Sequence, residues 1–257
     1  MSHSVAKMTQ PAIRKCLVRK AGEDTLLNFK VVGAVFAALV AGGAWWMMRP
    51  SAFDTGSPLI VEGTDVNLLA DLDPNQLSEG WVHRTFFTAS AADYQMVQDE
   101  DGVALQCTTN NSASILARDT NIPVSALPML SWDWKVIQPI ESNVDEATKD
   151  GDDHPARFFV VFSSDTEDRR AMEIIWSNQK YAPGEYKIIG DFYHYVANGL
   201  NENTGTWHSQ SVDLQQIYAE IGGTGTPTLE VIGFFCDSDN TGAQSDAMFR
   251  NVRLSPN

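Results

Sequence analysis

Carboxylates at alternate positions near the end of the sequence could bind a cation. Asp237 and Asp239 precede Gly242 in the segment DSDNTG, and Asp246 follows. Two carboxylates at this spacing, followed by a glycine that permits a sharp turn, resemble the first half of a calcium-binding loop. The glutamate that closes an EF-hand is replaced by Met248. The residues predict either a structural calcium held by Asp237, Asp239 and Asp246, or an acidic turn that needs no metal.

A second acidic cluster lies in the segment DGDDHPAR, residues 150–157, directly before the apolar run FFVVF. Asp152 or Asp153 could pair with Glu173 and supply acid–base catalysis. The same acids could instead form an ion-paired corner with Arg157. Arg157 is therefore a candidate ligand contact and equally a candidate buried ion-pair partner, and catalysis by this cluster is a hypothesis only.

Tryptophans at alternate positions could bind sugars. In the segment LSWDWKV, Trp132 and Trp134 fall on one face of the strand, where their rings could stack on a sugar ring. Leu130 and Val136 share that face, which favours packing in the core. For the aromatic run at 192–195, the sequence also leaves open whether the rings bind a sugar or pack in the core. The candidate ligand-binding residues are Trp132, Trp134, Arg157 and Trp176.

Missing motifs and the overall charge exclude several classes of function. The sequence has no P-loop, no G-x-G-x-x-G, no G-x-S-x-G, no H-E-x-x-H and no C-x-x-C, so nucleotide, haem and zinc chemistry have no support. Residues 51–257 contain 11 Lys and Arg against 31 Asp and Glu. A surface with this excess of negative charge repels phosphate backbones, so we expect no nucleic-acid partner.

One segment is apolar enough to cross a membrane. Val31 to Met48 form 18 residues without a charge, about 27 Å as a helix. Residues 1–50 carry 7 basic and 2 acidic side chains. Most of the basic ones precede the apolar run, which predicts that residues 1–30 are cytoplasmic. We expect an uncleaved anchor in the inner membrane, with the C-terminal domain in the periplasm. A cleaved signal peptide is the alternative.

The remaining residues predict one all-β domain. From Trp81 onward, short β-like runs alternate with turn residues, and the segment from Asp213 to Ile221 is the one convincing helix. This pattern favours a β-sandwich of jelly-roll type with one short helix. The predicted organisation is a basic leader (1–30), a transmembrane anchor (31–48), a linker with a first strand (49–78) and the sandwich (79–257).

The cysteines leave two possibilities open. Cys16 falls in the predicted cytoplasmic leader, whereas Cys107 and Cys236 fall in apolar strand-like segments of the predicted outer domain. An oxidising compartment would let these two form a disulfide. Two buried unpaired thiols are at least equally compatible with the residues, because a free cysteine packs as a small apolar side chain.

Six separated segments also carry a family resemblance. They are Ser112 to Ser114, Leu130 to Lys135, Gly151 to Arg157 with Val161 and Phe162, Trp176, Trp207, and Asp237 to Gly242. In this order the set resembles the bacterial domain-of-unknown-function family 3047, over roughly Trp81 to Leu254. The resemblance implies an envelope-associated β-sandwich similar to galactose-binding-like and carbohydrate-binding modules. It implies no established activity.

Three functions follow from these residues as hypotheses. The first is a membrane-anchored, non-catalytic module that binds a glycan or another polyhydroxylated envelope ligand, supported by the aromatic and acidic residues. The second is a glycan-active enzyme that uses a carboxylate pair. The third is a scaffold of the envelope without a small-molecule site. No cofactor is expected apart from the possible structural calcium.

Overall fold

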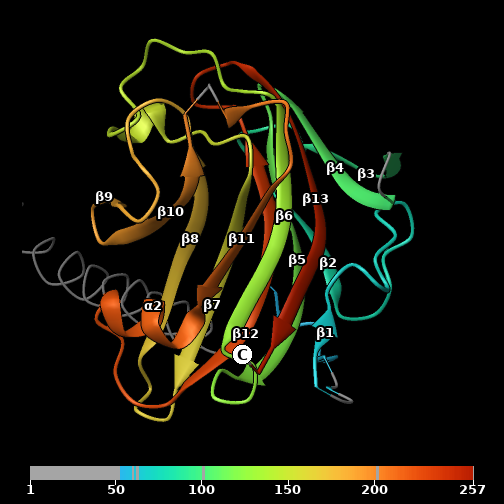
Figure 1. Ribbon diagram of the computed structural model, residues 1–257, viewed down its shortest axis with the longest axis vertical. Helices are drawn as coiled ribbons and strands as arrows, with labels where there is room; N and C mark the ends of the chain where they lie inside the picture. The colour runs from blue at the N-terminus through green and yellow to red at the C-terminus, as the bar shows by residue number, and fades with distance from the viewer. Residues whose placement is uncertain (1–52, 60, 62–63, 100–101, 201–202, 257) are drawn as a thin grey trace, which may run out of the picture. The chain divides into compact units, whose positions relative to one another are not determined.

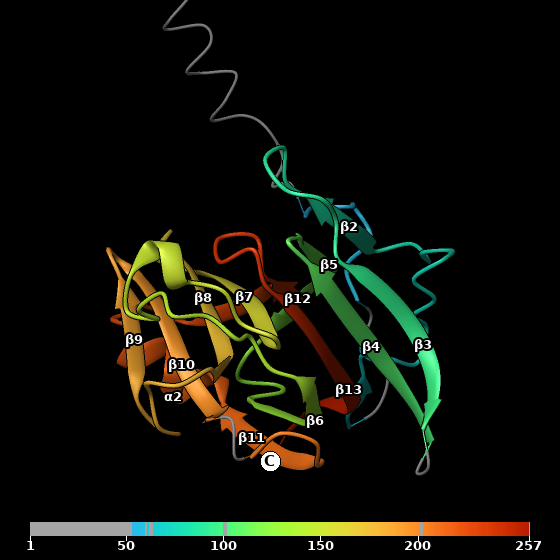
Figure 2. The ribbon, with the colours of Figure 1, turned by 90° about the horizontal axis from the view of Figure 1, so that it is seen from above.

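The computed structural model describes residues 53–59, 61, 64–99, 102–200 and 203–256. These residues form two β-sheets packed face to face with one short α-helix, so the predicted all-β sandwich is confirmed (Figures 1 and 2). The predicted leader (1–30) and anchor (31–48) lie outside the described residues. Within the described ranges, no helix combines the length and apolar character needed to span a bilayer.

The first sheet, here called sheet A, is antiparallel. Its main strands lie in the order β11, β6, β13, β4 and β3, and the short strand β1 also pairs with β13. The bounds are β1 Val66–Asn67, β3 Asp93–Asp99, β4 Gly102–Asn110, β6 Met129–Gln138, β11 His208–Asp213 and β13 Gln244–Ser255. Strand β1 falls within the segment predicted to hold the linker and first strand.

The second sheet, sheet B, has seven strands in the order β2, β5, β12, β7, β8, β10 and β9. Only the β8–β10 pair is parallel. The bounds are β2 Trp81–Thr85, β5 Ala113–Pro123, β7 Arg157–Ser164, β8 Arg169–Ser177, β9 Tyr186–Ile189, β10 Phe192–Gly199 and β12 Pro227–Asp237. Helix α2, Leu214–Glu220, begins where the Asp213 carboxylate accepts bonds from two backbone N–H groups, which confirms the predicted helix.

The core lies between the sheets and is rich in aromatic rings. Trp134 is fully buried, and its ring contacts Trp132, Phe158, Trp176 and Phe249. These rings come from both sheets, because the strands of each sheet direct alternate side chains inward. The inward side chains therefore form one continuous apolar layer.

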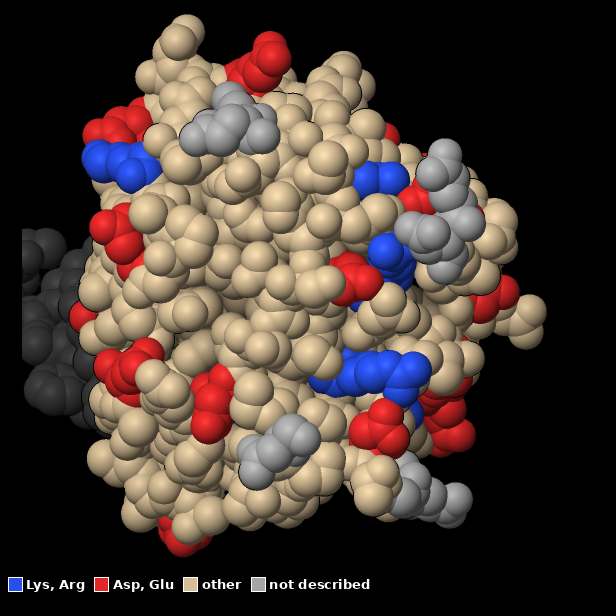
Figure 3. Space-filling view, viewed as in Figure 1, with Lys and Arg blue, Asp and Glu red and all other residues tan. Residues whose placement is uncertain are grey.

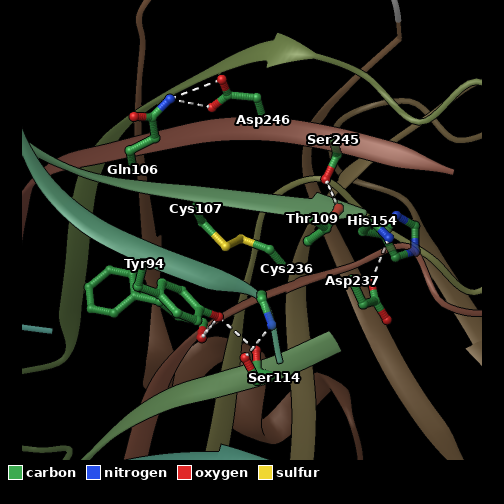
Figure 4. Close-up of a disulfide and its surroundings, with 12 residues drawn as sticks. Tyr94, Gln106, Cys107, Thr109, Ser114, His154, Cys236, Asp237, Ser245 and Asp246 are labelled. Carbon is green, nitrogen blue, oxygen red and sulfur yellow. Dashed lines mark hydrogen bonds between the residues drawn. A yellow bond between two sulfur atoms is a disulfide. The ribbon is translucent and has the colours of Figure 1, made fainter. Parts of the chain in front are cut away.

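A disulfide crosses the core. Cys107 of β4 in sheet A pairs with Cys236 of β12 in sheet B, and both residues are fully buried (Figure 4). Their Cα atoms are 6.5 Å apart. The structure therefore shows a disulfide, the less favoured of the two arrangements that the sequence left open.

The outer face of sheet B is apolar as well. A second buried cluster on this face comes from β5, β7 and β12, and partly buried side chains pack against it. The buried members are Ala113, Ile115, Ala117, Val161, Val231 and Phe235, and the partly buried ones include Phe53, Phe86, Phe159 and Ala171. The β6–β7 loop, residues 139–156, passes over the end of the sandwich at the top of Figure 1, where Glu146 and Asp153 accept bonds from residues that follow β8 and β12. Sheet B therefore has sheltered side chains on both faces, unlike a sheet with one solvated face.

Candidate functional site

A group of charged side chains is buried at one end of this outer face. Glu173 of β8 is the register partner of His194 on β10, and His194 is the partner of Lys187 on β9. Residues of the β6–β7 loop and of β12 complete the group. We call it the buried ionic network; its members are Glu146, Asp152, His154, Arg157, Glu173, Lys187, His194 and Asp237, and all but the half-buried Asp152 are buried.

Arg157 connects the β7, β8 and β12 parts of the network. Its Nη1 lies 2.5 Å from Glu173 Oε2, and its Nη2 forms an ion pair with Asp237. The guanidinium carbon also lies 4.0 Å from the centre of the Phe235 ring. Arg157 is only 2% exposed. Of its two expected roles, the structure shows the buried ion pair, and burial keeps the guanidinium out of reach of a ligand.

His154 is held as a neutral imidazole in the other half of the network. Its Nδ1 donates to the Trp176 carbonyl at 3.0 Å, so its Nε2 accepts from Lys187 Nζ at 2.9 Å. Lys187 Nζ also donates to Asp152 Oδ1 at 2.6 Å. Burial and the nearby Lys187 charge lower the pKa of His154 to about 3. Burial would raise the pKa of Asp152, but the neighbouring histidines and the Arg157 charge hold it well below its usual range.

This neutral histidine predicts a specific loss of stability in mild acid. Below about pH 6.5 the unfolded chain binds a proton at His154, whereas the folded protein does so only near pH 3. The free energy of unfolding should therefore fall by up to about 1.4 kcal/mol per pH unit between these values. We expect His154→Gln to reduce this slope clearly between pH 6.5 and 4.5, as measured by urea unfolding of the full-length protein; the part that stays comes from His83, whose pKa burial also lowers.

The matched control is His208→Gln, because His208 lies on β11 and is only half-buried. This variant should keep the slope of the wild-type protein. An unchanged slope in His154→Gln would contradict the assignment of a neutral, buried His154.

The predicted catalytic acids are close together but already engaged. Asp153 is fully buried, and its carboxylate accepts bonds from the Asn240 and Thr241 N–H groups at 3.2 and 2.7 Å. Glu173 is paired with Arg157, and Asp152 is paired with Lys187. None of the three lines either of the cavities of about 410 and 430 Å³ on sheet B. The structure offers no open carboxylate pair around these residues, so catalysis by them has no support from their geometry.

The predicted metal ligands are only partly brought together. Carboxylate oxygens of Asp153, Asp237 and Asp239 lie within 4.8 Å of one another. Asp246 belongs to a different place: it lies on β13 of sheet A, where both carboxylate oxygens accept from Gln106 at 2.9 Å (Figure 4). The third acid is thus Asp153 rather than Asp246. Burial and the nearby Asp153 charge raise the pKa of Asp239. Calcium binding stays a prediction that a calcium titration would test.

The predicted tryptophan platform does not reach a surface. Trp132, Trp134 and Trp176 are each at most 1% exposed and belong to the core between the sheets. A ligand cannot stack on these rings in this structure. Their placement corrects the expectation that they bind a ligand, and it agrees with the alternation with Leu130 and Val136 that favoured core packing.

Two cavities lie side by side on the outer face of sheet B, and we call them together the sheet B groove. Their volumes are about 410 and 430 Å³, and they share Arg169. The first is lined by Asp54, Pro58, Asp119, Asn121, Arg169, Glu230 and Val231. The second is lined by Asp168, Arg169, Arg170, Ala171, Ile189, Asp191 and Phe192. Sequence reasoning missed the groove, although it left open whether the aromatic run at 192–195 binds a sugar or packs in the core.

The strand register explains how the groove forms. Val231 and Val161 are partners on β12 and β7, and Val161 and Ala171 are partners on β7 and β8. Of these, Val231 lines the first cavity, and Ala171 lines the second beside Phe192, whose ring centre lies 5.1 Å from that of His194 in the buried ionic network. Together with Pro58 and Ile189 they form the apolar surface of the groove. Polar side chains from strand ends and turns surround this surface. The groove thus combines an apolar floor with a polar rim.

Comparisons with known proteins give a family and distant structural neighbours. A family 11 carbohydrate-binding module from Clostridium thermocellum, in complex with a mixed-linked β-1,3-1,4 tetrasaccharide, is 11% identical with a TM-score of 0.41, over 76% of this chain and 97% of that chain. A family 30 carbohydrate-binding module of a Clostridium thermocellum cellulosomal cellulase is 11% identical with a TM-score of 0.37, over 77% and 92%. No curated protein matches the chain. The model of the family described as "Protein of unknown function (DUF3047)" matches residues 79–253, and the chain belongs to this family.

Proposed function

We propose that the domain binds a sugar-like, polyhydroxylated ligand in the sheet B groove and acts by binding rather than by catalysis. The observation that carries this proposal is the pairing of an apolar floor with a polar rim in the same groove. Sugar rings have the complementary chemistry, because their CH faces pack on apolar side chains while their hydroxyl groups bond to carboxylates, amides and guanidiniums.

Phe192 supplies the aromatic surface of the groove. Among the residues that the structure describes, it is the one aromatic side chain that lines either of the two cavities, and it is half-buried, so one part of the ring is fixed while another faces the cavity. The edge-to-face contact with His194 holds its orientation. Ile189 and Ala171 lie beside it in the same cavity. A ring fixed in this way offers a ligand contact area at little entropic cost.

The rim supplies groups that can bond to hydroxyls. Arg169 and Glu230 form an ion pair with a distance of 2.9 Å between Nε and Oε2, yet their side chains remain 52% and 31% exposed. Asn121 adds an amide to the same cavity. The volume of each cavity falls within the range of about 300–1,000 Å³ typical of small-molecule sites. Two such cavities in a row suit a short oligosaccharide better than a single small ion.

The test is the loss of binding when the aromatic surface is removed. We expect Phe192→Ala to weaken the binding of envelope polysaccharide fragments about 5- to 30-fold, because such an aromatic contact contributes about 1–2 kcal/mol. Isothermal titration of the full-length protein measures the change. Phe87→Ala is the matched control, because Phe87 is fully exposed in the β2–β3 connection and lines neither cavity. Equal affinities of the wild-type protein and Phe192→Ala would reject the groove as the site.

We also propose that this binding takes place outside the cytoplasm, with residues 31–48 as a single-pass inner-membrane anchor and the sandwich in the periplasm. The Cys107–Cys236 disulfide supports this placement, because disulfides persist in oxidising compartments and are rare in the cytosol. The domain then faces the glycans of the envelope, which are polyhydroxylated ligands of the proposed kind.

A further inference from the structure

Asp119 of β5 is a buried carboxylate on the wall of the sheet B groove. It is 8% exposed and lines the cavity of about 410 Å³. One carboxylate oxygen, Oδ2, accepts bonds from the N–H and the hydroxyl of Thr55 at 3.1 and 3.0 Å. Over the part of the chain that the structure describes, no Lys, Arg or His nitrogen forms an ion pair with Asp119. Its negative charge therefore has hydrogen bonds but no cation beside it.

The two arginines of the groove cannot neutralise this charge, because each is paired with another acid. Arg169 Nε lies 2.9 Å from Glu230 Oε2, and Arg170 Nε lies 3.0 Å from Asp168 Oδ2. The lining of the two cavities also includes Asp54 and Asp191, which are both exposed. The groove thus contains five carboxylates against two guanidiniums. Three of these carboxylates have no arginine partner among the lining residues.

The outer face of sheet A shows the opposite arrangement. Over β6 and β13, the Lys and Arg side chains lie beside acidic ones (Figure 3). Lys135 pairs with Asp99, Arg250 with Asp133, and Arg253 with Asp65. Each of these three cations has an acidic partner, whereas the groove on sheet B has more carboxylates than guanidiniums.

We infer that the groove favours ligands that carry a protonated amine, of the amino-sugar class, with the ammonium group paired to Asp119. This inference rests on the proposed function and names the ligand class for the same groove. An ammonium supplies the cation that the buried carboxylate lacks, and its attraction is strengthened where water is excluded. The same charges disfavour uronic acids, whose carboxylates meet like charge in the groove.

Three tetrasaccharides of equal length but different charge test this inference. They are the tetramers of glucosamine (positive), N-acetylglucosamine (neutral) and galacturonic acid (negative). At low salt and mildly acidic pH, we expect the glucosamine tetramer to bind the full-length protein at least about 10-fold more tightly than the acetylated one, and the acidic one to bind most weakly. The preference should shrink as salt screens the charges. Asp119→Asn should reduce the preference for the glucosamine tetramer over the acetylated one to about 2-fold, because the amide keeps an acceptor for Thr55 but loses the charge.

Asp93→Asn is the matched control, because it removes the same charge from β3 of sheet A and should keep the full preference. Thermal melting confirms that both variants are folded. If the acetylated tetramer binds at least as tightly as the glucosamine tetramer, the amine preference is overturned while the proposed function stands. If Asp119→Asn keeps the full preference, the assignment to Asp119 is overturned. If none of the three tetramers binds, the proposed function falls together with the inference.

Discussion

Loss of the Cys107–Cys236 disulfide is expected to lower the free energy of unfolding by about 4–5 kcal/mol. The cross-link joins residues 129 positions apart, and closing a loop of that length removes a large entropy from the unfolded chain. It also ties β4 of sheet A to β12 of sheet B across a core in which both cysteines are fully buried. Urea unfolding of the Cys107→Ala/Cys236→Ala variant of the full-length protein measures the change.

Reduction of the wild-type protein is the control for packing, because it breaks the cross-link but keeps both sulfur atoms in the core. Reduced wild-type protein and the double variant should lose similar amounts of stability. Equal urea midpoints with and without reductant would contradict a structural disulfide. In protein taken from cells without reductant and then unfolded in denaturant, Cys107 and Cys236 should resist alkylation. Reactive thiols at both positions would speak against the proposed periplasmic placement.

The sandwich could be predicted because its pattern is local. On β6, Leu130, Trp132, Trp134 and Val136 alternate with polar residues, and all four are buried in the core. A period of two residues reports directly which side chains a strand turns inward. The helix after Asp213 was equally visible, because an N-cap residue and a terminal Gly-Gly mark its limits in the sequence itself.

The buried ionic network could not be predicted, because it depends on strand register. Glu173, Lys187 and His194 meet on three different strands, and no spacing in the sequence specifies which residues face one another. The same reason explains the error over the acidic cluster. Asp246 is near Asp237 in the sequence, yet β13 carries it into sheet A, whereas Asp153 arrives from a distant loop. Sequence proximity was a poor guide to which carboxylates share a site.

The groove was missed for a related reason. Its lining comes from short pieces of several strands and turns, each of which reads as an ordinary strand end. Sheet B is sheltered on both faces, so its strands lack the alternation that would separate inward from outward side chains. For the run at 192–195 the sequence left open whether the rings bind a sugar or pack in the core, and only the register showed that Phe192 lies on the outer face next to His194.

Arg157→Ala is expected to lower the free energy of unfolding by about 3–5 kcal/mol at neutral pH. The variant leaves the carboxylates of Glu173 and Asp237 buried without their cation, and an uncompensated buried charge is far more costly than a lost surface ion pair. It also removes the guanidinium that covers the Phe235 ring. Urea unfolding of the full-length variant measures the loss, and far-UV circular dichroism confirms that the variant is folded before denaturant is added.

Arg253→Ala is the matched control for the same change of side chain. Arg253 pairs with Asp65 at 2.8 Å, but both side chains are 46% exposed, so water replaces the lost partner and the expected change is about 1 kcal/mol or less. If Arg157→Ala proved as mild as Arg253→Ala, Arg157 would not be the residue that neutralises the buried acids. Because Glu173 is also the register partner of His194, the same ion pair helps to hold the strands on which Phe192 and the sheet B groove are built.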